Sequence, residues 1–250
     1  MRYRSANPVL RAMRDDVHSG TETASYTGVV SKSGLLLLIM MIVGSFTYSQ
    51  IVNQLDIPSG LFTLIFVAPI IAFISIIIGM RSLRMSWFFS LVYALCQGAF
   101  LGVISGIYEV AYGGTAGNGI VATAILATVG VFTGMLILYA SGMFRVTEMF
   151  RRVLYTALLG LVISSFFLII FFLFSGFNTQ GMIGFIFAIV IISVVVASLY
   201  LMVDFDNIRI MVEGGADKRT EWMLSLGLLV TLVWLYIEIL RLIAILRSRK

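Results

Sequence analysis

Three acidic side chains lie within or at the end of long apolar runs, where a carboxylate is costly. Asp204 and Asp206 directly follow an apolar run over residues 183–203, and Glu238 lies well inside another run over residues 222–246. An ionisable side chain inside a membrane costs free energy unless it is paired or hydrated, so it indicates a functional site by default. These three carboxylates are the first candidates for chemistry.

A close approach of two of these carboxylates would make a pH sensor. Two carboxylates side by side cannot both ionise at low cost, so they share one proton. We expect a carboxylate at the end of the first run, Asp204 or Asp206, to form such a pair with Glu238. The pair would respond to pH near neutrality without a histidine, and the single histidine, His18, lies in a polar N-terminal stretch. Once ionised, the pair offers the carboxylate oxygens that Ca²⁺, a hard cation, prefers.

Two plainer interpretations of the same residues stay open. Arg241 lies three residues after Glu238, so the two side chains can form an ion pair within one helix that only neutralises itself. Asp206 lies where the helix is expected to meet water, and an acid there is often merely solvated. The candidate pH sensor and gate therefore comprises Asp204, Asp206, Glu238 and Arg241, with Asp204 and Glu238 as candidate transient ligands of Ca²⁺.

The composition places these residues in an integral membrane protein. Of 250 residues, 60% are hydrophobic and only 12% are charged, and the mean hydropathy is +1.05. A soluble fold of this size could not hide so much apolar surface, which excludes a cytosolic enzyme, a disordered chain and a nucleic-acid-binding domain. The single cysteine, Cys96, excludes an intrachain disulfide and any metal site built from several cysteines.

The apolar runs predict an all-α membrane protein with seven transmembrane helices. Backbone polar groups in lipid must pair within their own segment, and the alternating short strands of an outer-membrane barrel are absent from the sequence. Residues 1–32 are polar and are predicted to be a cytoplasmic tail, and residues 33–250 form the transmembrane domain. The predicted spans are Gly34–Ile51, Leu61–Met80, Trp87–Ile107, Gly119–Ser141, Leu154–Phe174, Ile183–Val203 and Trp222–Leu246.

The distribution of lysine and arginine predicts the orientation. Basic residues occur in the N-terminal stretch and in alternate loops, whereas the loops around Asp56, Gly113 and Phe177 carry none. The positive-inside rule then puts the N-terminus in the cytoplasm. The last span is less simple, because residues 241–250 are also basic and would lie outside after a full crossing. We expect the full crossing, with re-entry of the helix as the alternative.

Glycines at positions 98, 102 and 106 lie at four-residue spacing in the third span. Small residues at this spacing share one helix face and let two helix backbones approach closely in lipid. Gly98, Gly102 and Gly106 are therefore predicted to be a helix-packing face, with a pore-lining role as the lesser alternative.

Two segments near the C-terminus carry a family resemblance. The stretch Leu199–Ile208, with Tyr200, Asp204 and Ile208, and the stretch Leu235–Leu242, with Leu235, Tyr236 and Glu238, resemble the last two helices of the Bax inhibitor-1 family. The order Gly98, Gly102 and Tyr108 in the third span is also similar to that family. The resemblance implies a compact seven-helix bundle with the last helix at its centre, and a pH-sensitive Ca²⁺ leak gated by a pair of carboxylates. By motif position, Asp204 takes the place of the first carboxylate and Glu238 that of the second.

The sequence departs from the family pattern in three places. Glu238 stands where the family usually has aspartate, the second span has no acid, and residues 213–217 lengthen the stretch between the two carboxylates. A turn near residues 215–218 would put Val230 or Thr231 level with Asp204, leaving Glu238 about 10 Å deeper. Tilt or local unwinding must then bring Asp204 and Glu238 together, or Asp206 and other partners are used instead.

Other function classes fit less well or remain alternatives. An intramembrane protease lacks the necessary histidines or aspartate motif, and a retinal protein lacks a lysine within a span. Two function classes remain as alternatives to the leak. One is a secondary transporter such as a Ca²⁺/H⁺ exchanger, and the other is a non-conducting regulator of a membrane protease or of a cell-death or stress pathway.

We expect no enzymatic activity and no cofactor. Ca²⁺ and H⁺ are the expected ions, and a membrane protein is a possible partner of the monomer. The expected location is the bacterial plasma membrane, or alternatively the endoplasmic reticulum.

Overall fold

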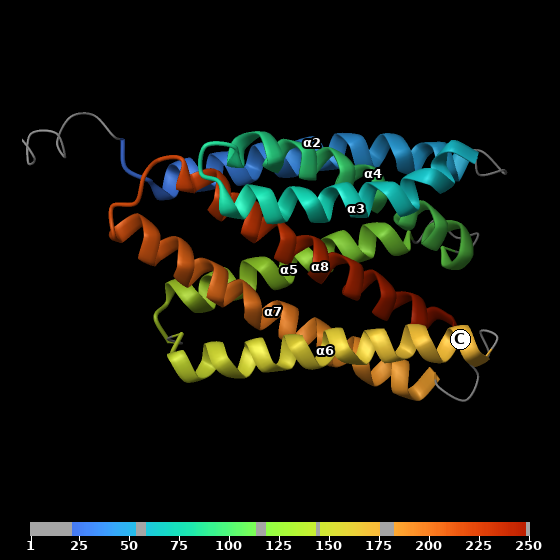
Figure 1. Ribbon diagram of the computed structural model, residues 1–250. Helices are drawn as coiled ribbons and strands as arrows, with labels where there is room; N and C mark the ends of the chain where they lie inside the picture. Colours follow the sequence, from blue (N-terminus) through green and yellow to red (C-terminus); the bar gives the residue numbers. More distant parts are fainter. Residues whose placement is uncertain (1–21, 54–58, 114–118, 144–145, 176–182, 249–250) are drawn as a thin grey trace, which may run out of the picture.

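The structure is a computed structural model that describes residues 22–53, 59–113, 119–143, 146–175 and 183–248. Its described elements are helices, and all seven are long and apolar enough to cross a membrane. They form one bundle in which helices consecutive in the sequence run roughly antiparallel (Figure 1). The helices are α2 Tyr26–Asn53, α3 Ser59–Arg81, α4 Ser86–Tyr112, α5 Ile120–Ala140, α6 Glu148–Ser175, α7 Ile183–Glu213 and α8 Thr220–Ser248.

The seven predicted spans each correspond to one of these helices. The helices run past the apolar runs at the polar ends, because helical hydrogen bonding continues after the chain leaves the hydrocarbon layer. The largest extensions are at α7, which continues ten residues beyond Val203, and at α2, which begins at Tyr26. Residues 26–32, which the sequence assigned to the tail, are thus the first turns of α2. Asp56 and Phe177 lie outside the described residues.

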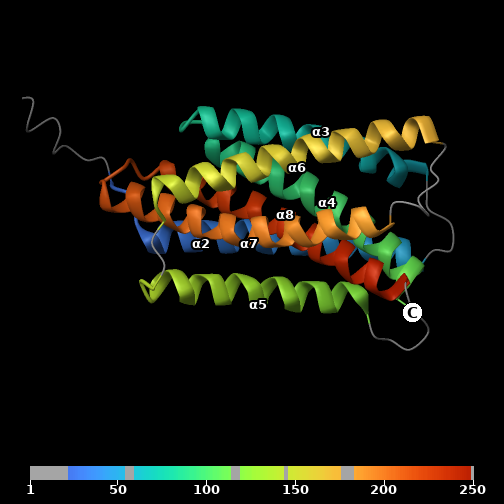
Figure 2. The same cartoon turned by 90° about the horizontal axis from the view of Figure 1, so that it is seen from below.

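The last helix, α8, lies at the centre of the bundle. It packs against α2, α3, α4, α5 and α7, and Leu226, Leu229 and Leu235 on it are fully buried. Figures 1 and 2 show the same arrangement from two directions, with α8 inside and the other helices around it. The implied central position of the last helix is therefore present in the structure.

The first described residues and the end of α8 lie at opposite ends of the bundle (Figure 1). The end with residues 22–25 is called the N-terminal end, and the other the C-terminal end. At the C-terminal end, Arg247 of α8 donates hydrogen bonds to the carbonyl oxygens of Tyr112 and Gly113, at 3.2 and 3.1 Å. The 29 residues of α8 span about 43 Å, so this helix is long enough to cross a membrane fully.

The glycine face of α4 meets α2. A Cβ atom at Gly98 would lie 2.8 Å from the Met40 carbonyl oxygen, and one at Gly106 would lie 2.7 Å from Ile51. A Cβ at Gly102 would overlap both the Thr47 hydroxyl and the Gly44 carbonyl oxygen. The two backbones therefore touch, and the three glycines are packing residues in this structure.

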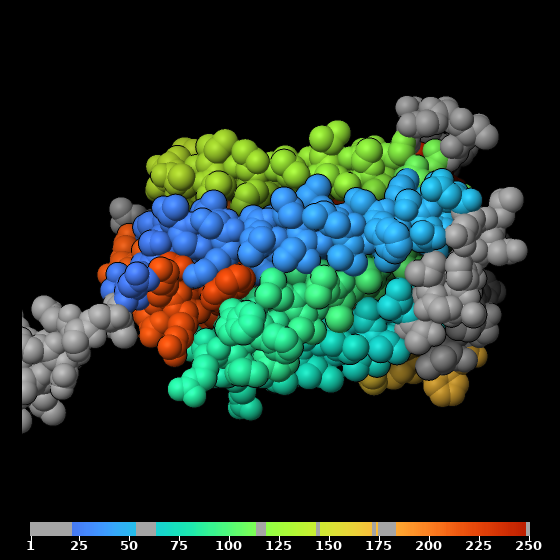
Figure 3. Space-filling view, turned by 90° about the horizontal axis from the view of Figure 1, so that it is seen from above, coloured from blue at the N-terminus to red at the C-terminus, as the bar shows by residue number. Residues whose placement is uncertain are grey.

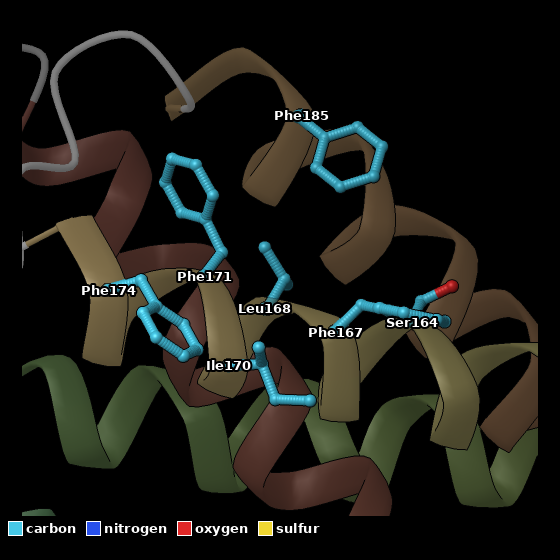
Figure 4. A pocket seen from close by; sticks show the side chains of 7 residues that line it. All are labelled: Ser164, Phe167, Leu168, Ile170, Phe171, Phe174 and Phe185. Carbon is cyan, nitrogen blue, oxygen red and sulfur yellow. The ribbon is translucent and has the colours of Figure 1, made fainter.

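Helix α6 lies at the edge of the bundle and packs against α7 alone among the described helices. Near the C-terminal end these two helices enclose a groove of about 530 Å³ (Figure 4). Its walls are apolar apart from one hydroxyl and include four phenylalanines, and it holds no ionisable group. The groove is lined by Ser164, Phe167, Leu168, Ile170, Phe171, Phe174 and Phe185.

Candidate functional site

Asp204 lies on α7 at its contact with α8 and has an unsatisfied oxygen. The residue is partly buried, but its Oδ2 atom is shielded from solvent and has no hydrogen-bond partner. The hydrogen-bonding neighbour of the carboxylate is the hydroxyl of buried Thr231, whose single proton can go either to this carboxylate or to the Gly227 carbonyl oxygen 3.4 Å away. A buried carboxylate with so few partners is costly when ionised, because nothing replaces the water it has lost.

Glu238 lies deeper along α8 and pairs within its own helix. Its Oε2 atom is 3.4 Å from Nη1 of Arg241, one turn further on. Glu238 is 8% exposed, whereas the Arg241 side chain is 43% exposed. The pair therefore extends from the buried interior toward the surface, as the plainer interpretation of these two residues anticipated.

Asp204 and Glu238 do not meet in this structure. Asp204 is level with Thr231, which is seven residues before Glu238, an offset of about 10 Å along α8. Among the described residues, no hydrogen bond or ion pair joins the two carboxylates. The expected shared proton is therefore absent from this arrangement, because the long α7–α8 connection sets the helix register that separates them.

Two fully buried leucines fill the interval between these carboxylates. Leu201 is one turn beyond Asp204, and Leu235 is one turn beyond Thr231, both toward Glu238. They belong to a single apolar cluster built by α7, α8 and their neighbours. The α7–α8 contact is therefore closed at this depth.

Asp206 is paired, not solvated. It is only 3% exposed. Its carboxylate accepts hydrogen bonds from Nη2 of Arg151 on α6 at 2.5 Å and from the Tyr139 hydroxyl on α5 at 3.0 Å, and Arg209 lies 3.1 Å away. This cluster joins the ends of three helices at one depth. It corrects the interpretation of Asp206 as a solvated acid.

Arg151 also connects α6 to the next residue of α7. Its Nη1 atom donates to Oδ1 of Asn207 at 2.8 Å. A second link lies one turn further along, where the rings of Tyr155 and Tyr200 are 6.0 Å apart. Since α6 packs against α7 alone among the described helices, these contacts hold it on the bundle.

Arg151, Tyr139 and Asn207 were not among the candidates from the sequence. The predicted topology could have indicated these residues, because the end of α5, the start of α6 and the end of α7 must lie at the same end of the bundle. Any polar side chain within one turn of these helix ends can reach the others. Spacing alone cannot say which of them do.

The structure does not contain a preformed calcium cage among the residues it describes. No three side chains of histidine, cysteine, aspartate or glutamate lie close enough there to hold a metal ion together. Ca²⁺ in a stable site takes six to eight oxygen ligands.

Comparison with known proteins identifies the family. No curated protein matches the chain. The model of the family described as Bax inhibitor 1 like matches residues 7–248, nearly the whole chain, and the chain therefore belongs to the Bax inhibitor 1 like family of membrane proteins.

Proposed function

We propose that this protein is a pH-sensitive cation leak that conducts Ca²⁺ along the contact between α7 and α8. The observation that carries the proposal is the Oδ2 atom of Asp204, a buried carboxylate oxygen without a hydrogen-bond partner. A purely structural carboxylate would be paired, as Asp206 is with Arg151 and Tyr139. An unpaired one keeps its capacity to bind a proton or a cation.

The order of polar groups along the two helices supports a path. From the N-terminal end, a cation would pass the Asp206 cluster, then Asp204 with Thr231, and then Glu238 with Arg241. Between Asp204 and Glu238 the path is blocked by the buried side chains of Leu201 and Leu235. The structure thus fits a closed state, and conduction requires α7 to shift relative to α8.

Protonation of Asp204 provides the pH control in this proposal. A neutral Asp204 is compatible with the closed packing, whereas an ionised one requires water or a cation at its free oxygen. Rising pH therefore favours hydration of the α7–α8 contact and attracts Ca²⁺ to it. Leak should be slow in acid and faster above neutrality.

Ca²⁺ uptake into proteoliposomes tests this function. Purified protein is reconstituted, an indicator is enclosed, and uptake is followed at several pH values against protein-free liposomes from the same lipid. The proposal predicts uptake that rises with pH and persists when the proton gradient is abolished by an uncoupler. Uptake that stops with the uncoupler would indicate Ca²⁺/H⁺ exchange, and no uptake at any pH would indicate a non-conducting regulator.

A further inference from the structure

The short segment Glu22–Ser25, which precedes α2, lies across the turn between α7 and α8. Thr23 forms an isolated antiparallel bridge with Asp217. The Ala24 amide donates to the Ala216 carbonyl oxygen at 2.8 Å, and the Lys218 amide donates to the Glu22 carbonyl oxygen at 2.9 Å. Figure 3 shows the blue start of the chain against the orange atoms of this turn. We call residues Glu22–Ser25 the strap.

A buried glutamate fastens the strap to the first turn of α8. Glu221 is 1% exposed, and its Oε1 atom accepts hydrogen bonds from the Ser25 amide at 2.8 Å and from the Ser25 hydroxyl at 3.1 Å. Its Oε2 atom forms an ion pair with Lys32 of α2. A carboxylate is also favoured here by the positive end of the helix dipole. Glu221 is thus fully paired, unlike Asp204.

The packing around Glu221 requires close contact with α2. A Cβ atom at Gly28 would overlap the Glu221 carboxylate, so a side chain at this position of α2 would displace that carboxylate from its present place. One turn along α8, the Ser225 hydroxyl donates to the Val29 carbonyl oxygen at 3.0 Å. The strap, the start of α2 and the start of α8 therefore form one interlocked unit.

We propose that the strap is a conformational restraint that holds the C-terminal end of α7 and the N-terminal end of α8 together and thereby limits the leak. The two helices are connected only by residues 214–219, and the strap pairs with that connection and with α8 at once. Any shift of α7 against α8 strains this pairing. The effect on leak rests on the proposed function, whereas the restraint on the helix ends does not.

Hydrogen exchange tests the restraint without measuring flux. Ser25→Ala removes two hydrogen bonds of the strap, one to the buried Glu221 carboxylate and one accepted from the Gly28 amide of α2. Amides of residues 214–222 should therefore exchange about tenfold faster. Ser49→Ala is the matched control, because the Ser49 hydroxyl bonds only the Phe46 carbonyl oxygen of its own helix. Equal exchange in Ser25→Ala and Ser49→Ala would overturn the restraint.

A reversible cross-link tests the effect on leak. Thr23→Cys and Asp217→Cys are combined in a Cys96→Ser background, since residues facing each other across an antiparallel bridge have Cα atoms near enough for a disulfide. The oxidised protein should leak several-fold more slowly than the same protein after reduction, and each single cysteine variant should not respond to oxidant. Failure of the disulfide to form would overturn the pairing.

The two failures are distinguishable. Equal leak in the oxidised and reduced double variant would overturn the strap as a limit on leak while leaving the proposed function intact. Absence of leak in both forms, and in the Cys96→Ser parent, would contradict the proposed function. The restraint on α7 and α8 would then stand or fall on the hydrogen exchange of Ser25→Ala alone.

Discussion

Asp204 on α7 is level with Thr231 on α8, so Glu238 lies about 10 Å away along the helix axis instead of beside it. Leu201 and Leu235 fill the interval and are fully buried. The two carboxylates are therefore separate sites along the proposed path and not one proton-sharing pair. This separation changes what their mutants should do.

The double mutant Asp204→Asn with Glu238→Gln should show additive effects on the logarithm of the Ca²⁺ leak rate. Sites about 10 Å apart without shared partners act independently. A pair that shares one proton would behave as a unit, and the double mutant would then be no worse than either single mutant. Measuring leak for the wild type, both single mutants and the double mutant distinguishes these cases. A double mutant equal to the singles would contradict the separation seen here.

Arg151→Met should lower the free energy of unfolding by about 3 kcal/mol, because it removes a buried partner of Asp206 and loosens α6. Arg152→Met is the matched control, since Arg152 is the neighbouring residue and is exposed. Denaturation in detergent, followed by circular dichroism, measures both. A loss of similar size in the two variants would mean that the Arg151–Asp206 pair does not hold α6.

Gly102→Ala should destabilise the protein by about 2 to 3 kcal/mol, because the added methyl group overlaps Thr47 and Gly44 on α2. Gly134→Ala should be neutral or stabilising by about 1 kcal/mol, since a Cβ atom there meets open space and alanine favours helix. Both variants are compared by thermal unfolding in the same detergent. Equal stability of the two would show that the α2–α4 contact tolerates a wider spacing.

Cysteine labelling tests the orientation that the basic residues predict. In a Cys96→Ser background, Ser248→Cys at the exposed end of α8 should react with an impermeant reagent from outside intact cells, and exposed Ser141→Cys should react only after lysis. The two residues lie at opposite ends of the bundle, as the start of α6 and the end of α8 do in Figure 1. The reverse pattern would put the N-terminal end outside.

The ion pair of the strap should not contribute to the pH dependence of leak. Glu22 hydrogen-bonds the exposed Lys218 ammonium and raises the pKa of that group. A lysine pKa raised by folding stabilises the folded state below the unfolded pKa of about 10.4, and this contribution is lost only as pH rises through the higher folded value. Lys218→Met should therefore leave the leak profile from about pH 6 to about pH 8 unshifted. A shift in the pH midpoint of the leak of Lys218→Met would indicate that the strap, and not Asp204, senses pH.

The sequence was sufficient to predict the helices, and also the contacts that are made within one helix or by residues at a repeated spacing. Hydropathy located all seven spans, the four-residue spacing of Gly98, Gly102 and Gly106 indicated the α4 packing face, and three-residue spacing indicated the Glu238–Arg241 pair. Each of these follows from local geometry. The sequence also indicated an offset of about 10 Å between Asp204 and Glu238. The expectation that the two carboxylates would nevertheless meet is wrong for this structure, in which no hydrogen bond or ion pair among the described residues joins them.

Partners on different helices could not be predicted in the same way. Arg151 is 55 residues from Asp206, and Ser25 is 196 residues from Glu221. The rotation and tilt of the helices decide which polar side chains face one another. The hydropathy of a helix that is apolar on all faces predicts neither its rotation nor its tilt. Glu221 directly precedes the predicted span Trp222–Leu246, and nothing in the sequence indicated that the structure buries it under the strap.

Ca²⁺ uptake by Asp204→Asn proteoliposomes between about pH 6 and about pH 8 tests the central claim most directly. Asparagine keeps the shape of the side chain but cannot ionise, and Glu213→Gln is the control because it removes an exposed carboxylate from the same helix. The account predicts that the wild type and Glu213→Gln leak faster as pH rises, whereas Asp204→Asn leaks at one low rate throughout. A wild-type pH profile in Asp204→Asn would contradict the account.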